Sequence, residues 1–379
     1  MSAPREAATE RRPACEACLR RSWLLGELSA LLDYHRGDPP RLRALLELPG
    51  EALIAALAGR RREELARAYG ELDTGALLRS ARGGAICPHT GAPPASFAAG
   101  ERMLWLSSSR SRAMRLLDGP SVAIIGGRSA SPYGVQMAAS LGRGLAAAGV
   151  TLLAGLAGEL AQSAHHGVLA AGGASLALAG DGLGRIRPAE AARLAALLAR
   201  RGCVAAELPW AAGGRGWGAL AAEQAAVELA EVTILVEAYE EEPATAAARA
   251  LLARGGALGA VPGPVTSRRS AGAHELLREG ATLIADTHDA LELLHRRSPG
   301  RQSHAPSVSD EVQLEGLAGE LLERIGAGED SPERLARDAR DPGAVIAALG
   351  ELEAMGLITR LPGGRYGARD PARRPSRPG

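Results

Sequence analysis

The sequence predicts an α/β fold: a Rossmann-like doubly wound parallel sheet, with a helical domain before it and a winged-helix domain after it. From Val122 to Leu294, short apolar runs alternate with helical stretches at the spacing of βαβ units. The runs are continuously apolar, which is typical of strands that are covered on both faces. Two of them end in glycine-rich turns, as in nucleotide- and phosphate-binding sheets. The expected strands are 122–125, 150–154, 175–179, 203–207, 232–236, 257–261 and 282–285.

Length and composition indicate a globular protein. The chain has 379 residues, 46% of them hydrophobic, which is enough for two or three domains with buried cores. The net charge is +1, and every basic residue is arginine, which indicates a GC-rich coding bias more than a nucleic-acid surface. Met1–Arg12 has no apolar segment of a signal peptide, and no run of about eighteen apolar residues occurs. We therefore expect a soluble, cytoplasmic protein without membrane contact.

The first domain, residues 1–80, is predicted to be helical, because its leucines recur at the spacing of an amphipathic helix. Pro49-Gly50 interrupts the second apolar run. This turn fits either a helix-hairpin-helix or sterile-alpha-motif type of DNA-backbone binder, or a simple connection between two core helices. The Rossmann-like domain is assigned to residues 81–296.

The C-terminal part is predicted to be a linker followed by a winged helix. Residues 297–309 are rich in Arg, Ser, Pro and His, a composition that is typical of linkers. Residues 310–368 show three helical patterns and a two-stranded hairpin, which is the winged-helix arrangement. Its expected recognition helix, 342–349, carries few basic residues. A solvated charged face and a protein-contact surface are therefore alternatives to DNA binding by this helix.

The glycine turn after the first strand of the sheet is a candidate anion site. Gly126 and Gly127 let the backbone approach an anion closely, and Arg128 adds a guanidinium that can make a bidentate contact. A second turn, with Gly155 and Ala157, ends the next strand. Adjacent turns at the carboxyl ends of parallel strands open into one crevice, which suits an extended anion. A tight turn with a solvated arginine is the alternative.

The helix after the second turn carries His165 and Gly167, which complete the candidate DNA- or phosphate-binding set. A histidine on a helix is either a ligand-binding group or a structural hydrogen-bonding group. Both interpretations remain open from the sequence.

The order of these segments resembles that of the DprA/Smf (DNA-processing protein A) family. The family's G-S-R appears as Gly126-Gly127-Arg128, and its second glycine segment as Ala154-Gly155-Leu156-Ala157 through Ala164-His165. No single motif decides the resemblance, but the ordered set covers most of the chain. Further matching segments are Gly180-Asp181-Gly182, Glu207-Leu208-Pro209, Leu235-Val236-Glu237-Ala238 and Val261-Pro262-Gly263.

The sequence departs from the family where the family carries basic residues. Ala222-Glu223-Gln224 stands where the family has F-P-x-R-N-R, and Ala161 replaces an aspartate after the second turn. Glu240, Glu241 and Glu242 add negative charge. Because affinity for a nucleic-acid strand depends on phosphate neutralisation, we expect weaker DNA binding unless other arginines compensate.

The resemblance implies a single-stranded DNA-binding protein of natural transformation and recombination that presents DNA to a RecA-type recombinase and forms homodimers. It implies no enzyme, and the sequence shows no partnered nucleophile and base. Two alternatives stay open, a Rossmann-like nucleotide-binding protein and a partner-binding remnant that has lost DNA binding.

Four residues form a candidate zinc site. Cys15-x-x-Cys18 is a common half-site, and Cys87-Pro88-His89 offers a second pair with a tight one-residue spacing. The alternative is that the cysteines are reduced and simply pack. Cys203 lies in an expected strand and is assigned to the core. Apart from this structural zinc, we expect no cofactor.

Overall fold

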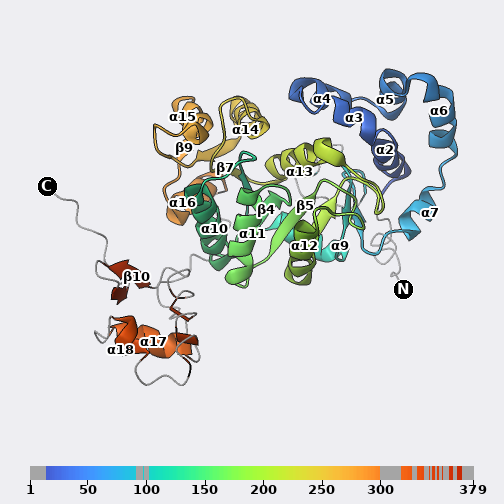
Figure 1. Cartoon of the computed structure of the whole chain (residues 1–379). Helices are drawn as coiled ribbons and strands as arrows, with labels where there is room; N and C mark the ends of the chain where they lie inside the picture. The colour runs from blue at the N-terminus through green and yellow to red at the C-terminus, as the bar shows by residue number, and fades with distance from the viewer. Residues whose placement is uncertain are drawn as a thin grey trace, which may run out of the picture. The chain divides into compact units, whose positions relative to one another are not determined.

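The computed structural model describes residues 14–90, 97, 102–298 and parts of 317–368. The chain divides into two compact units, Met1–Ala305 and Pro306–Gly379. The first unit contains a sheet with helices on both faces and a group of N-terminal helices (Figure 1). Its helices are α2 (Glu16–Glu27), α3 (Ser29–Tyr34), α4 (Pro39–Leu46), α5 (Gly50–Leu57), η1 (Gly59–Arg61), α6 (Arg62–Glu71), α7 (Thr74–Arg79), α9 (Arg110–Asp118), α10 (Pro132–Ala147), α11 (Glu159–Ala170), α12 (Ala189–Arg201), α13 (Arg215–Leu229), α14 (Pro243–Ala253), η2 (Arg268–Ser270), α15 (Ala271–Arg278) and α16 (Thr287–Arg297).

The sheet has nine strands in the order β1-β2-β6-β5-β4-β3-β7-β8-β9. From β6 to β9 all neighbours are parallel, which confirms the predicted parallel sheet and its seven strands. The chain adds strands outward from β3 on one side, then returns to β7 on the other, so the topology switches between β3 and β7. The strands are β1 (Ala85–Ile86), β2 (Leu104–Leu106), β3 (Ser121–Ile125), β4 (Thr151–Gly155), β5 (Ser175–Ala179), β6 (Cys203–Ala206), β7 (Val232–Leu235), β8 (Ala257–Ala260) and β9 (Thr282–Leu283).

One edge of the sheet is antiparallel, which corrects the expectation of a purely parallel sheet. Strand β2 pairs antiparallel with β6, and β1 pairs antiparallel with β2. Both strands are short but fully buried, and Trp105 in β2 is 1% exposed. They extend the sheet beyond β6 and cover an edge that would otherwise present unpaired backbone groups.

Helices cover both faces of the sheet, as a doubly wound fold requires. On one face α10, α11 and α16 pack on β3, β4 and β7, and on the other α9 and α13 pack on β3 to β6. Helices α10 and α11 approach closely because Gly142 and Gly167 lack side chains. A methyl group at Gly142 would overlap the carbonyl oxygen of Ala164, and one at Gly167 that of Ala139. Closely packed interiors tolerate such overlap poorly.

The N-terminal helices pack against α13. Leucines of α2, α3, α4, α5 and α6 share one apolar cluster with Leu208 and Trp217. The indole of Trp217 donates to Ser29 Oγ at 2.9 Å, and its backbone amide donates to Asp33 Oδ1 at 3.0 Å. Pro49 is the N-cap of α5, so the Pro49-Gly50 turn begins a helix within this cluster.

The second unit contains α17 (Leu317–Gly326), α18 (Pro332–Leu335) and the antiparallel pair β10 (Ile358–Leu361) and β11 (Arg365–Ala368). Its core joins residues of both helices and both strands with Val345, Leu349 and Leu352. Most of the predicted third helix, 342–355, and the predicted linker beyond Ser298 lie outside the described residues. None of the described helices is long and apolar enough to cross a membrane.

Candidate nucleic-acid interface

The candidate site lies where the strand order reverses, at the carboxyl ends of β3 and β7. Ile125 pairs in register with Leu235, so the loops that follow these strands lie side by side. The amide of Gly127 donates to the carbonyl oxygen of Glu237 at 2.6 Å. Ligands of open α/β sheets bind outside such a switch point.

The two predicted glycine turns do come together. Gly126 packs against α11, because a methyl group at Gly126 would overlap the Leu160 side chain. Gly155 ends β4 and Ala157 is exposed in the turn that follows. Gly158, the N-cap of α11, has a φ of +89°, a conformation that favours glycine, and offers no side-chain acceptor to the first turn of the helix. The helix dipole of α11 therefore points toward the same crevice as Arg128.

The protein's own carboxylates occupy part of the first turn. Glu242 accepts hydrogen bonds from the amides of Arg128 (3.1 Å) and Tyr239 (2.9 Å). Glu237 is buried and accepts from the amide (2.9 Å) and the hydroxyl (2.7 Å) of Ser131. The amides of Gly127 and Arg128 are therefore already bonded within the protein, which corrects the expectation that they cradle a phosphate. The Arg128 side chain and the second turn remain as the candidate elements for binding an anion.

Arginines from a third loop join Arg128 at this edge. Arg268 and Arg269 follow β8, and Arg269 donates to Ser129 Oγ (3.1 Å) and to its carbonyl oxygen (3.2 Å). Arg128 and Arg268 are exposed. Arg268 and Arg269 were not predicted from the sequence, because they lie far from Arg128 in the chain. In the sheet, however, β8 is only two strands away from β3.

Two tyrosines lie among these arginines. Tyr133, in the first turn of α10, is 38% exposed and donates its hydroxyl to the carbonyl oxygen of Pro262 at 2.7 Å. The guanidinium carbon of Arg268 lies 5.9 Å from the ring centroid of Tyr239. Exposed aromatic rings beside arginines are a platform on which unpaired bases stack. A tyrosine that follows a glycine turn closely in the sequence is a signal that could have identified this surface.

Glu223, which replaces a basic residue of the family, faces this crevice. Burial of this half-buried carboxyl, with repulsion by Glu242, raises its pKa to about 8, although Arg128 opposes the shift. Glu223 is therefore mostly protonated at neutral pH. It adds less negative charge to the crevice than its sequence indicates.

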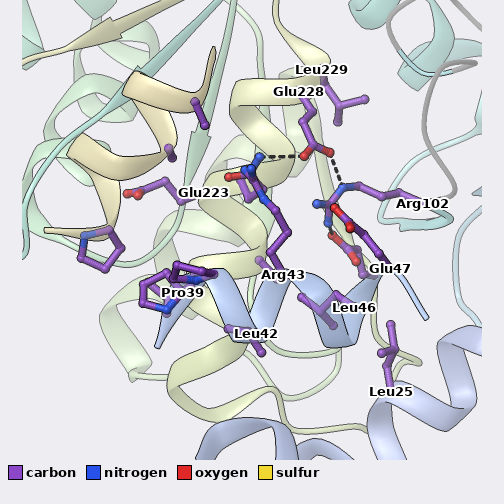
Figure 2. A pocket seen from close by; sticks show the side chains of 18 of the residues that line it. Leu25, Pro39, Leu42, Arg43, Leu46, Glu47, Arg102, Glu223, Glu228 and Leu229 are labelled. Carbon is purple, nitrogen blue, oxygen red and sulfur yellow. Dashed lines mark hydrogen bonds and ion pairs between the residues drawn. The ribbon is translucent and has the colours of Figure 1, made fainter. Parts of the chain in front are cut away.

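The opposite side of Glu223 borders a cavity of about 1020 Å³ between α4, α13 and α14. Figure 2 shows Pro39, Leu42, Arg43 and Leu46 of α4 on one side of it and Glu223 and Glu228 of α13 on the other. The cavity wall contains an ion network in which Arg102 pairs with Glu207 and, at 2.6 Å, with Glu228. Gln224 donates to Glu228 at 2.7 Å. The lining contains as many arginines as glutamates.

His165 and Gly167 do not belong to the site. His165 is fully buried; its Nδ1 lies 3.2 Å from Ser175 Oγ and its Nε2 lies 3.3 Å from the carbonyl oxygen of Ala154. Gly167 allows the close contact of α11 with α10. Both residues therefore support the packing of the sheet, which corrects their assignment to DNA binding.

His165 predicts an acid-sensitive stability. Burial lowers its pKa from 6.5 to about 4, so the folded protein excludes a proton that the unfolded chain binds. The free energy of unfolding should therefore fall as the pH drops from about 6.5 to about 4, by roughly 2–3 kcal/mol from this residue. Urea denaturation at pH 7 and pH 5 measures the effect. The His165→Gln variant should lose less stability than the parent over this interval, and an equal loss would contradict the assignment.

The predicted metal ligands also come together, away from the crevice. Cys15, Cys18, Cys87 and His89 place one ligand atom each within 4.8 Å of one another. Cys18 Sγ lies 3.2 Å and Cys15 Sγ 3.6 Å from His89 Nδ1. Cys203 is buried in β6, as expected for a core residue.

Comparison with known proteins agrees with the fold and the order of motifs. The family model described as DNA recombination-mediator protein A matches residues 111–295. Protein Smf of Escherichia coli K12 is 32% identical over 251 residues, which cover 64% of this chain and 66% of that protein. DNA processing protein DprA of Bacillus subtilis 168 is 26% identical over 183 residues, 48% of this chain and 62% of that protein. The chain thus spans slightly less than two thirds of either relative.

A solved structure shares the fold. The X-ray structure of DNA processing protein A from Streptococcus pneumoniae superposes with a TM-score of 0.57 at 20% identity, over 74% of this chain and 98% of that one. Fold and crevice define a Rossmann-like protein with an arginine- and tyrosine-lined switch point. Residues 111–295 match the model of the DprA/Smf family, and this region is similar to proteins of that family.

Proposed function

We propose that this chain binds single-stranded DNA along the carboxyl edge of its sheet, as a DNA-processing protein of transformation and recombination. The observation that carries the proposal is the combination of exposed Arg128, Arg268 and Tyr133 with the partly buried Tyr239 around one switch point. The arginines supply phosphate contacts, and the rings supply stacking surfaces that only unpaired bases can reach. A small anion would need the arginines but not the tyrosine rings.

Two features offset the loss of the basic residues that the family carries at this site. Arg268 and Arg269 bring positive charge to the crevice from the loop after β8. Glu223 is mostly neutral at neutral pH because of its raised pKa. Similarity to the family further supports a binding role instead of catalysis, a RecA-type recombinase as partner and a homodimer as the working form. The winged-helix assignment of the second unit is part of the same proposal.

A fluorescence-anisotropy titration of the full chain separates the candidate functions. Labelled single-stranded oligonucleotide should bind more tightly than a duplex of the same sequence, and free nucleotides should compete poorly. Equal affinity for the duplex would remove the role of base stacking. Strong competition by a free nucleotide would favour the nucleotide-binding alternative, and no binding at all would favour the partner-binding remnant.

DNA binding should weaken in mild alkali. The raised pKa of Glu223 means that this carboxyl loses its proton as the pH passes about 8, and the new charge repels phosphate. Affinity for single-stranded DNA should fall roughly twofold to tenfold between pH 7 and pH 9, the scale of one partly screened charge. The Glu223→Gln variant stays neutral and should show little change over this range. Parallel pH profiles for parent and variant would show that Glu223 does not face the bound strand.

A further inference from the structure

We propose that Cys15, Cys18, Cys87 and His89 bind one structural zinc ion that joins the N-terminal helices to the antiparallel edge of the sheet. The proposal is independent of DNA binding. It rests on four potential ligands from two segments that are more than sixty residues apart in the chain and meet at one point.

The geometry is close to that of a tetrahedral site. Zinc–sulfur bonds of about 2.3 Å place neighbouring ligand atoms about 3.8 Å apart. The distances from Cys18 Sγ and Cys15 Sγ to His89 Nδ1, 3.2 and 3.6 Å, and the upper limit of 4.8 Å for the whole set bracket this value. Small side-chain adjustments are therefore enough to seat an ion. Three sulfurs and one imidazole nitrogen favour zinc over hard cations such as magnesium and calcium.

Two of the sulfurs lie at a helix N-terminus, and hydrogen-bonding groups contact the third. Cys15 is the N-cap of α2 and Cys18 lies in its first turn, where the helix dipole stabilises negative charge. The amide of Cys15 donates to Cys87 Sγ at 3.3 Å, and Thr90 Oγ1 lies 3.2 Å from the same sulfur. Hydrogen bonds of this kind orient metal-bound thiolates and reduce their charge.

The position of the site indicates a structural role. Four protein ligands leave no open coordination position, as in structural zinc sites. Cys87 follows β1, which pairs with β2, while Cys15 and Cys18 begin the first described helix. Beneath the ligands, Cys18, Leu19, Met103 and Trp105 share an apolar cluster. The ion would thus close a long loop and fix the helical region to the sheet.

Metal analysis of the full chain, purified without a tag or chelators, tests the proposal. About one zinc per chain is expected. Replacing zinc by cobalt should give the visible bands of a tetrahedral site together with thiolate-to-cobalt charge transfer. Blocking the thiols of the parent protein should release the ion, and chelation should lower the melting temperature and expose the N-terminal helices to proteolysis.

Two variants make the test specific. His89 is exposed, so His89→Ala should fold normally but bind zinc at least tenfold more weakly. Cys203→Ser removes a cysteine that lies outside the set and should keep the full zinc content. Folded parent protein without zinc after zinc-supplemented expression would overturn the proposal. Unchanged zinc affinity in both His89→Ala and Cys87→Ser would also overturn it, because the ion would then lie elsewhere.

Discussion

Arg102→Ala should lower the free energy of unfolding by about 3 kcal/mol, the largest stability effect that we expect from one substitution. Arg102 pairs with both Glu207 and Glu228 in the wall of the cavity, and its side chain is only 20% exposed. Although burial opposes the shift, the arginine lowers the pKa of Glu228. Removing it leaves two poorly hydrated carboxylates without their ion-pair partner, which costs about 3–5 kcal/mol at buried pairs. The 30% exposure of Glu228 places this pair at the lower end of that range.

Urea denaturation of parent and variants at pH 7 measures this loss. Arg193→Ala, on the exposed face of α12, is the matched control and should change stability by less than about 0.5 kcal/mol. Adding Glu228→Gln to Arg102→Ala should recover part of the loss, because one of the stranded charges disappears. A loss below about 1 kcal/mol for Arg102→Ala would show that water reaches the network freely.

Arg128→Ala should reduce the affinity for single-stranded DNA by about 1–3 kcal/mol, roughly fivefold to 150-fold, the scale of a charge-assisted contact. The backbone amide of residue 128 keeps its bond to Glu242 in the variant, so the substitution tests the guanidinium alone. The slope of log affinity against log salt should become shallower by about 0.7, as for one lost contact with a single strand.

Anisotropy titrations between low and moderate salt measure both quantities. Arg193→Ala again serves as the control and should bind DNA like the parent, because α12 packs on β5 and β6, on the other side of β3 from the loops after β7 and β8. If Arg128→Ala binds as tightly as the parent while remaining folded, the crevice is not the DNA site. The partner-binding remnant then becomes the better interpretation.

The parallel strands could be predicted from the sequence because each is a continuous apolar run between turn signals. Ser175–Ala179 and Cys203–Ala206 are buried at every position, as strands covered on both faces must be. Strands β1 and β2 could not be predicted in this way. Two or three residues, such as Ala85–Ile86, are too few to show any periodicity, and β2 pairs with β6, a partner about 100 residues away.

The candidate site was only partly predictable. The meeting of the two glycine turns follows from parallel topology, but the hydrogen bonds of Glu237 and Glu242 to the loop after β3 do not, because they depend on the path of the loop after β7. His165 carried an unused signal. It lies beside Ala164 on the apolar stripe of its helix, where a histidine is expected to be buried. The clustering of Cys15, Cys18, Cys87 and His89 could be predicted because cysteine and histidine are informative even when their spacing is unusual.

Photo-crosslinking locates the bound strand most directly. A photoreactive phenylalanine analogue replaces either Val265, which is 88% exposed in the loop after β8, or Leu197, which is 46% exposed on α12. Both positions accept a bulky side chain without disturbing the core. With single-stranded oligonucleotide bound, the analogue at Val265 should crosslink to DNA efficiently and the one at Leu197 should not. Equal crosslinking at both positions, or crosslinking at Leu197 alone, would contradict DNA binding at the carboxyl edge of the sheet.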